Sequence, residues 1–299
     1  MSDIKLLTYN IWWYCMTGKG NKAGSGCIDG IAETIENNGP YDFINLQEAS
    51  NDIKLQADAP LLKSMGRKHA KGGAEHITTY YDKNKYTLHT TGVYSGDLDG
   101  GGHPYLFLAF KEGIVLLNVH PGHVGWTNAH SQIENAMAKH GLENKYPGYR
   151  YIMSGDFNTN ISFTYVTFGS IKMYVGKQLK TCCIPASNSG APVTQSGLAD
   201  YSPYSYYFDH VLDSAAPPVE TEIPDIVRPA SDHAPILATL VPLPPHSSPS
   251  PSPHSSVSPP PLPPMSPSGT SYNELFKYSL ISGGILLILV VIIIILIKG

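Results

Sequence analysis

The sequence predicts a mixed α/β sandwich in residues 1–241, followed by a disordered Pro/Ser-rich linker in residues 242–272 and a transmembrane helix in residues 278–298. Three observations lead to this prediction. Short apolar runs outnumber amphipathic helical segments before residue 241. The composition changes abruptly to Pro, Ser and His after Leu240. The last stretch of the chain is almost wholly apolar.

The predicted strands are short apolar runs bounded by turn residues. They are Ile4–Tyr9, Phe43–Leu46, His76–Tyr81, Tyr86–Thr90, Tyr105–Phe110, Ile114–Val119, Tyr151–Ser154, Tyr206–Leu212 and Pro235–Val241. Two further segments have the period of an amphipathic helix, Ile28–Asn37 before Gly39 and Asn128–His140 before Gly141. Many strands and few long helices are typical of an α+β or α/β sandwich.

The C-terminal part is unlike the domain that precedes it. Residues 242–272 cannot bury a core, so we expect an extended, partly polyproline linker. The run Pro259–Pro264 could dock on a proline-motif-binding domain, although a plain spacer is the simpler interpretation. Within residues 278–298, every residue from Ser279 to Ile297 is apolar, small or hydroxylic, and the stretch is long enough to cross about 30 Å of hydrocarbon. We expect a single-pass tail anchor, with the domain facing the cytosol.

The charge balance argues against a protein that binds polyanions over a broad surface. The chain has 20 Lys and Arg against 24 Asp and Glu, and its formal net charge is −4 at pH 7. Proteins that bind nucleic acid through its backbone usually present a strongly basic face. A local basic groove is still compatible with these numbers.

The cysteines and the N-terminus both favour a reducing compartment. Cys15, Cys27, Cys182 and Cys183 are few and unevenly spaced, and the adjacent pair does not bridge easily in ordinary backbone geometry. We therefore interpret all four as free thiols. The first residues lack the basic start and the apolar core of a secretory signal.

Polar motifs follow the apolar runs, where a loop can present them at the edge of a sheet. Hydrolysis of a phosphate ester needs a hard cation, a carboxylate that positions water, and donors aimed at the developing charge. Glu48 suits Mg²⁺, which needs only one or two protein carboxylates. Asp156 and Asn158 can place a water-activating carboxylate beside an amide. His233 can serve as acid, base or phosphate donor, and Asp209 could fix its tautomer.

Six segments occur in an order that is typical of one superfamily: LLTYNIWW, INLQEA, LLNVH, MSGDFNTN, FDHVL and SDHAPI. Together they resemble the signatures of the endonuclease/exonuclease/phosphatase superfamily, which includes pancreatic-type deoxyribonucleases, inositol polyphosphate phosphatases and neutral sphingomyelinases. The resemblance implies a four-layer α/β/β/α sandwich of two packed mixed sheets. It also implies a metal-dependent phosphoesterase that works by attack of an activated water.

The resemblance also implies roles for single residues. Mg²⁺, or else Mn²⁺ or Ca²⁺, would be bound by Glu48 with Asn10 and Asp232 close by. Asp156 would activate water, and Asn158 would position the phosphate. Any one of these motifs could be a simple turn. Their occurrence in family order favours the functional interpretation.

The remaining catalytic assignments concern histidines. His120 and His233 would surround the scissile phosphate, with Asp209 as the partner of one of them. Abasic-site endonucleases usually carry an aromatic hydroxyl where His120 stands, so the histidine favours the other branches. The substrate is left open between nucleic acid and a phospholipid or inositol phosphate. A catalytically inactive, membrane-tethered scaffold that binds partners through its proline-rich segment is the alternative from another class.

Overall fold

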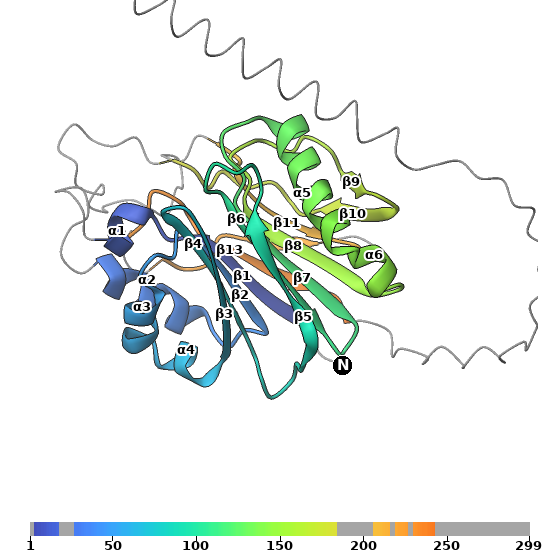
Figure 1. The fold of residues 1–299 in the computed structure, drawn as a ribbon. Helices are drawn as coiled ribbons and strands as arrows, with labels where there is room; N and C mark the ends of the chain where they lie inside the picture. The colour runs from blue at the N-terminus through green and yellow to red at the C-terminus, as the bar shows by residue number, and fades with distance from the viewer. Residues whose placement is uncertain (1–2, 18–26, 184–205, 216–218, 227–229, 243–299) are drawn as a thin grey trace, which may run out of the picture. The chain divides into compact units, whose positions relative to one another are not determined.

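The fold is built from two β-sheets that pack face to face (Figure 1). A computed structural model describes residues 3–17, 27–183, 206–215, 219–226 and 230–242. Sheet A has six strands. In spatial order they are β12 (Glu220–Glu222), β13 (Ile236–Leu240), β1 (Ile4–Asn10), β2 (Phe43–Gln47), β4 (Glu75–Tyr81) and β3 (Gly66–Gly72). The seven-stranded sheet B contains β5 (Leu88–Asp97), β6 (Pro104–Phe110), β7 (Ile114–Val119), β8 (Arg150–Asp156), β11 (Asp209–Asp213), β10 (Ile171–Val175) and β9 (Tyr165–Phe168).

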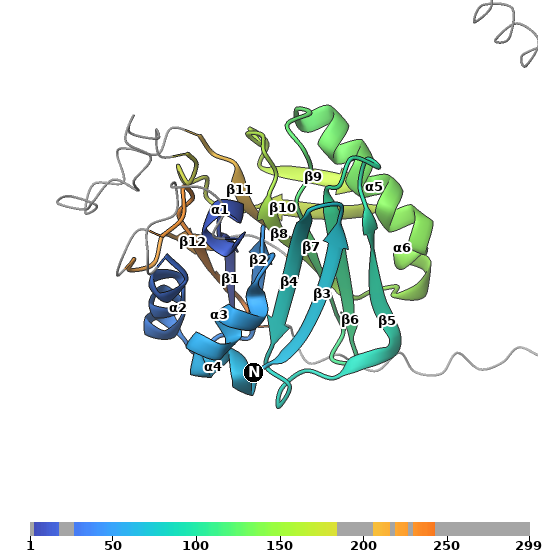
Figure 2. The ribbon, with the colours of Figure 1, turned by 60° about the vertical axis from the view of Figure 1, so that its left-hand side comes forward.

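Both sheets are mixed, as predicted. The β1–β2 and β7–β8 pairs are parallel, and the other paired strands are antiparallel. The helices lie on the outer faces (Figure 2). Those beside sheet A are α1 (Trp13–Thr17), α2 (Cys27–Asn38), α3 (Asp52–Asp58) and α4 (Pro60–Ser64), and those beside sheet B are α5 (Trp126–His140) and α6 (Leu142–Lys145).

Alternating side chains divide the apolar core into three layers. On β1, Leu6 belongs to the cluster between the sheets, whereas Leu7 packs with α2 on the outer face of sheet A. On β7, Leu116 points between the sheets and Leu117 packs with α5. This period of two, with helices covering both outer faces, gives the predicted four-layer sandwich.

A layer of buried polar side chains interrupts the apolar core between the sheets. Asn45 donates to the Ser154 hydroxyl at 2.9 Å, and Gln47 donates to the Asn118 side chain at 2.8 Å. Asn118 in turn donates to the carbonyl of Thr78 at 3.1 Å. Buried amides need such partners, so these bonds fix how sheet A lies on sheet B.

Several elements differ from the sequence prediction. The edge strand β3 was missed because only Ala70 and Gly72 among its residues are buried and the rest are largely polar. Such polar edge strands resist pairing with other chains and have no apolar alternation to find. The strand predicted at Tyr86–Thr90 is instead β5, which begins at Leu88 and is longer. Strands β9, β10 and β12 and helices α1, α3, α4 and α6 were also not predicted.

The prediction of four free thiols is wrong in this structure. Cys15 is joined to Cys27, with the two Cα atoms 5.7 Å apart, because α1 and α2 pack together at the edge of the same layer. Cys182 is joined to Cys183 across a cis peptide bond. The prediction had assumed ordinary trans geometry for the adjacent pair.

The predicted membrane helix at residues 278–298 lies outside the described residues, as does the linker at 242–272 apart from Pro242. Among the helices that the structure does describe, none has the length and apolar character needed to cross a bilayer.

One buried ion pair joins the neighbouring strands β8 and β11 of sheet B. The Arg150 guanidinium donates to both carboxylate oxygens of Asp213, at 2.8 Å for Nε and Oδ1, and to the carbonyl of Val241 at 2.6 Å. Both side chains are buried. Arg150→Met would leave Asp213 charged and unpaired, so we expect a loss of about 3–5 kcal/mol in the free energy of unfolding, measured by chemical denaturation.

The double variant Arg150→Met/Asp213→Leu is the matched control, because it removes both charges together. We expect it to recover most of the lost stability. Equal losses in the single and the double variant would contradict the ion-pair account.

Candidate active site

The predicted site residues come together at one end of the two sheets. All of them stand in or next to a strand end: Asn10 in β1, Glu48 after β2, His120 after β7, Asp156 in β8, Asn158 after β8, Asp209 in β11, and Asp232 with His233 before β13. The sequence prediction that these residues are presented at a sheet edge therefore agrees with the geometry.

Asp156 is the centre of the arrangement. Its carboxylate is buried, and Asn10 Nδ2 donates to Oδ2 at 2.9 Å. The Nε2 atoms of His120 and His233 each lie 3.5 Å from the same oxygen. Asp156 therefore has neighbours from sheet A, from sheet B and from the loop before β13.

His233 and Asp209 form a close pair. His233 Nδ1 lies 2.7 Å from Asp209 Oδ2, so the carboxylate holds the proton on Nδ1 and leaves Nε2 facing Asp156. The register of the sheet explains why the carboxylates are neighbours, since Asp209 on β11 is directly opposite Asp156 on β8. The backbone N–H of His233 donates to Ser231, whose hydroxyl donates to the carbonyl of Asn10 at 2.6 Å.

Glu75 is a site residue that sequence reasoning missed. Its Oε2 atom lies 3.1 Å from His120 Nδ1, on the opposite side of the imidazole from Asp156. Glu75 is the first residue of β4, which runs antiparallel to β2 and therefore starts where β2 ends. Only the order of the strands could have revealed it, because Glu75 follows no apolar run and matches no motif.

Asn158 is held close to Asp156 by an unusual backbone. Its φ is +51°, its N–H donates to Asp156 Oδ1 at 2.8 Å, and its Nδ2 donates to the carbonyl of Pro121 at 2.9 Å. Gly155 allows the neighbouring strand β7 to approach, since a Cβ there would overlap the carbonyl oxygen of Val119. The amide predicted to position phosphate is thus at the site but bound to Pro121.

The proposed metal ligands have the character of a cation site. Glu48 accepts a hydrogen bond from Asn10 Nδ2 at 3.1 Å and another from the backbone of Trp13. Asp232 Oδ1 is buried and has no hydrogen-bond partner among the described residues. Burial raises the pKa of Asp232 to about 6, and the charges of Glu48 and Asp156 add to this effect. A divalent cation would relieve this repulsion, so the oxygen donors fit Mg²⁺.

A second group of possible ligands is better explained by hydrogen bonding. One ligand atom each from Asp156, Asp209 and His233 lies within 4.8 Å of the others. The 2.7 Å contact between Asp209 and His233 places a proton there, so a cation on those atoms would have to displace it. The metal role of Glu48 and Asp232, with Asn10 beside them, therefore stays a prediction.

The histidines next to Asp156 are held in their charged form. Burial alone would lower the pKa of His120, but Asp156 and Glu75 outweigh it and raise the pKa well above its ordinary value. Burial also opposes the charge of His233, whereas Asp209 and Asp156 raise its pKa to about 10. In turn, the two imidazoliums hold the pKa of Asp156 below its usual range despite burial. The site therefore presents two N–H donors around an ionised carboxylate.

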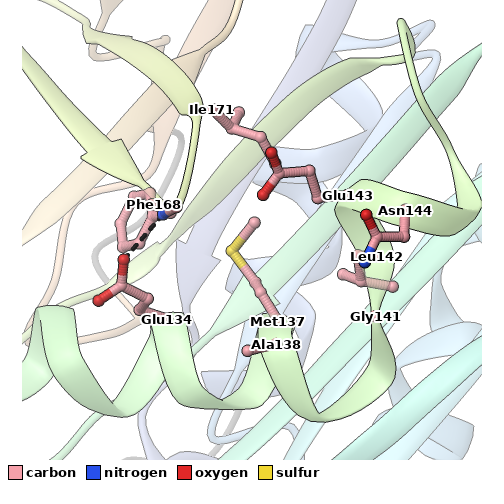
Figure 3. A pocket seen from close by; sticks show the side chains of 10 residues that line it. Glu134, Met137, Ala138, Gly141, Leu142, Glu143, Asn144, Phe168 and Ile171 are labelled. Atoms are coloured by element: carbon pink, nitrogen blue, oxygen red, sulfur yellow. Dashed lines mark hydrogen bonds between the residues drawn. The ribbon is translucent and has the colours of Figure 1, made fainter.

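One pocket in the described part of the chain lies away from these residues. This pocket of about 180 Å³ lies between α5, α6 and the turn that joins β9 to β10 (Figure 3). Glu134 flanks it and accepts a hydrogen bond from the backbone of Gly169 at 2.7 Å, while Met137 and Leu142 give it an apolar floor. None of the predicted site residues lines it.

Sequence comparison gives one informative relative. No family model matches the chain. An uncharacterised protein of Acanthamoeba polyphaga mimivirus is 27% identical over 265 residues, which cover 79% of this chain and 50% of the relative. The chain thus spans about half the length of the curated relative that it matches.

Solved structures show the fold directly. A mannosyl-6-phosphatase of Bacteroides thetaiotaomicron has a TM-score of 0.53 and is 14% identical, with 80% of this chain and 99% of that chain covered. An endonuclease/exonuclease/phosphatase family protein of the same organism gives 0.53 and 14%, covering 80% and 95%. The human Nocturnin catalytic domain, solved with a sulfate anion, gives 0.51 and 15%, covering 80% and 93%. This chain has the fold of the superfamily that its motifs resemble.

The charge on His233 should make the stability of the fold depend on pH. The pKa of His233 is raised, so the pair with Asp209 contributes fully below the unfolded value of about 6.5, and the contribution is lost as the pH rises through about 10. Between these two pH values, the contribution of His233 should lower the free energy of unfolding by about 1.4 kcal/mol for each pH unit.

Asp209→Asn should reduce that slope, because the amide does not favour the imidazolium. Unfolding measured between pH 6 and pH 10 without divalent metal checks this, and Asp58→Asn on the exposed end of α3 is the matched control. The assignment fails if both variants keep the pH dependence of the original protein.

Proposed function

We propose that the chain is a divalent-metal-dependent hydrolase of phosphate ester bonds. The observation that carries this proposal is the buried Asp156 carboxylate, which is contacted by Asn10, His120 and His233. Close to it is Asp232, whose Oδ1 has no hydrogen-bond partner among the residues that the structure describes. Phosphoesterases with the same fold, such as the mannosyl-6-phosphatase, support the proposal.

The residues of the site would have different roles in the reaction. Asp156 is ionised and accepts hydrogen bonds, so it would orient and deprotonate the attacking water. The Nε2 donors of His120 and His233 would stabilise negative charge on the phosphoryl oxygens as it develops. Asn158 would exchange its bond to Pro121 for a phosphate oxygen. When bound at Glu48 and Asp232, Mg²⁺ would neutralise further charge on the phosphate.

The charge balance, with 20 Lys and Arg against 24 Asp and Glu, favours a substrate with few phosphates over a long polyanion. Both arginines that the structure describes are engaged elsewhere, Arg67 with Asp52 and Arg150 with Asp213. Long nucleic acids normally gain affinity from many such cations. We therefore place a phospholipid head group or an inositol phosphate first, and nucleic acid second.

The C-terminal residues supply the rest of the proposal. We propose that residues 278–298 hold the enzyme at a membrane through a single C-terminal span. The proline-rich linker would set the reach of the domain and could bind a proline-motif-binding partner.

Activity tests the proposal. With Mg²⁺, the protein should hydrolyse the generic diester bis(p-nitrophenyl) phosphate, and Asp156→Asn should lower kcat by about 10²–10⁴ because the base is lost. Asp58→Asn should leave the rate unchanged. Phosphoinositide or sphingomyelin vesicles and plasmid DNA, assayed in parallel, separate the substrate classes.

An unchanged rate in Asp156→Asn would refute the assignment. No hydrolysis of any of these substrates, together with no stabilisation by Mg²⁺ in a thermal unfolding assay, would favour the inactive scaffold instead.

Co-sedimentation with lipid vesicles tests the anchor. We expect the full chain to pellet with vesicles and the variant Leu289→Arg/Ile293→Arg to stay in the supernatant, because each charge at the centre of a span costs about 2.5–3.5 kcal/mol. Equal recovery of both proteins in the pellet would argue against a spanning helix.

A further inference from the structure

The Glu75 carboxylate lies between two histidines. Its Oε2 atom is 3.1 Å from His120 Nδ1 and 3.3 Å from His103 Nδ1. The two imidazole rings are 6.0 Å apart and almost perpendicular. One carboxylate oxygen is therefore shared by a histidine of the proposed site and by a second histidine that the proposed chemistry does not use.

The loop before β6 is organised so that His103 reaches Glu75. The Asp97 carboxylate accepts hydrogen bonds from the backbones of Gly100 and Gly102, both at 2.8 Å. Leu98 N–H donates to the carbonyl of His103 at 2.8 Å and closes the loop. These bonds fix the backbone that carries the His103 ring.

The loop after β7 also depends on His103. A Cβ on Gly122 would lie 2.6 Å from His103 Nε2, so this glycine lets the ring pack against the backbone that follows His120. His103 thus touches both the carboxylate partner of His120 and the segment that His120 begins.

The two histidines differ in their access to water. The side chain of His103 is 25% exposed, whereas that of His120 is 3% exposed. His103 can therefore exchange protons with solvent while His120 lies behind Glu75. The described charged groups that face the His103 ring are Glu75 from β4, Asp99 from its own loop, at 3.8 Å, and His120 from the end of β7.

We infer that His103 is a positioning residue that competes with His120 for Glu75, so that a charged His103 slows the reaction. A charged His103 attracts the shared oxygen and repels the imidazolium of His120. Both effects weaken the contact between Glu75 and His120. The His120 ring is then less restrained, and its Nε2 atom faces Asp156 for a smaller fraction of the time. The inference about rate rests on the proposed function, but the competition itself does not.

The competition can be measured without any activity. In the full chain, kept in mild detergent, the imidazole of His103 is titrated by NMR. His120→Gln removes the competing cation 6.0 Å away, so the titration midpoint of His103 should rise by about 0.5–2 pH units. His130→Gln, which changes a half-buried histidine on α5 that bonds to the carbonyl of Thr167, should leave it unchanged. A His103 midpoint that stays within about 0.2 pH units in His120→Gln would overturn the inference.

The pH profile of kcat tests the consequence for the reaction. Between pH 8 and pH 5.5 the rate of the original protein should fall about fivefold or more beyond that of His103→Leu, which cannot take up the proton. KM should change little, because His103 does not touch the substrate. His103→Gln, which keeps the size of the side chain and lacks the titration, should behave like His103→Leu and serves if the leucine variant does not fold.

Equal pH profiles in all three proteins would overturn the positioning role even where the NMR coupling is found. If the original protein hydrolyses no substrate, the proposed function fails, while the titration still decides whether His103 and His120 share Glu75.

Discussion

The buried Asp156 carboxylate is the constraint on which the site depends. An ionised carboxylate is stable away from water only if hydrogen-bond donors and positive charge surround it. Here Asn10 comes from sheet A, His120 from the end of sheet B, and His233 from the loop before β13. Satisfying one carboxylate therefore fixes the relative position of three distant segments.

The polar layer beneath the site explains residues that the motifs contain but the chemistry does not use. Gln47 and Asn118 belong to two of the six motif segments, yet their side chains bond to each other between the sheets. Asn45 does the same with Ser154. An apolar core could pack in several registers, whereas paired amides accept only one, so these residues set the alignment that Asp156 requires.

The sequence predicted those parts of the molecule that have a local signal. Buried strands such as β7 have an unbroken apolar run, and Asp156 and His233 follow such runs within recognisable motifs. Edge strand β3 and residue Glu75 have no local signal, because their places are determined by pairing with other strands. The disulfide between Cys15 and Cys27 likewise depends on how α1 and α2 pack, which spacing alone does not reveal.

The hydrogen bond from Ser231 to the carbonyl of Asn10 joins residues 221 positions apart. Sheet A is completed only when β13 pairs with β1, the first strand of the chain. During synthesis, one edge of β1 therefore stays unpaired until almost the entire domain has left the ribosome. Pairing between segments so far apart in sequence slows folding. A nascent chain interrupted before residue 232 would hold most of the histidines and carboxylates of the candidate site but lack Asp232 and His233, so incomplete products would lack part of that site.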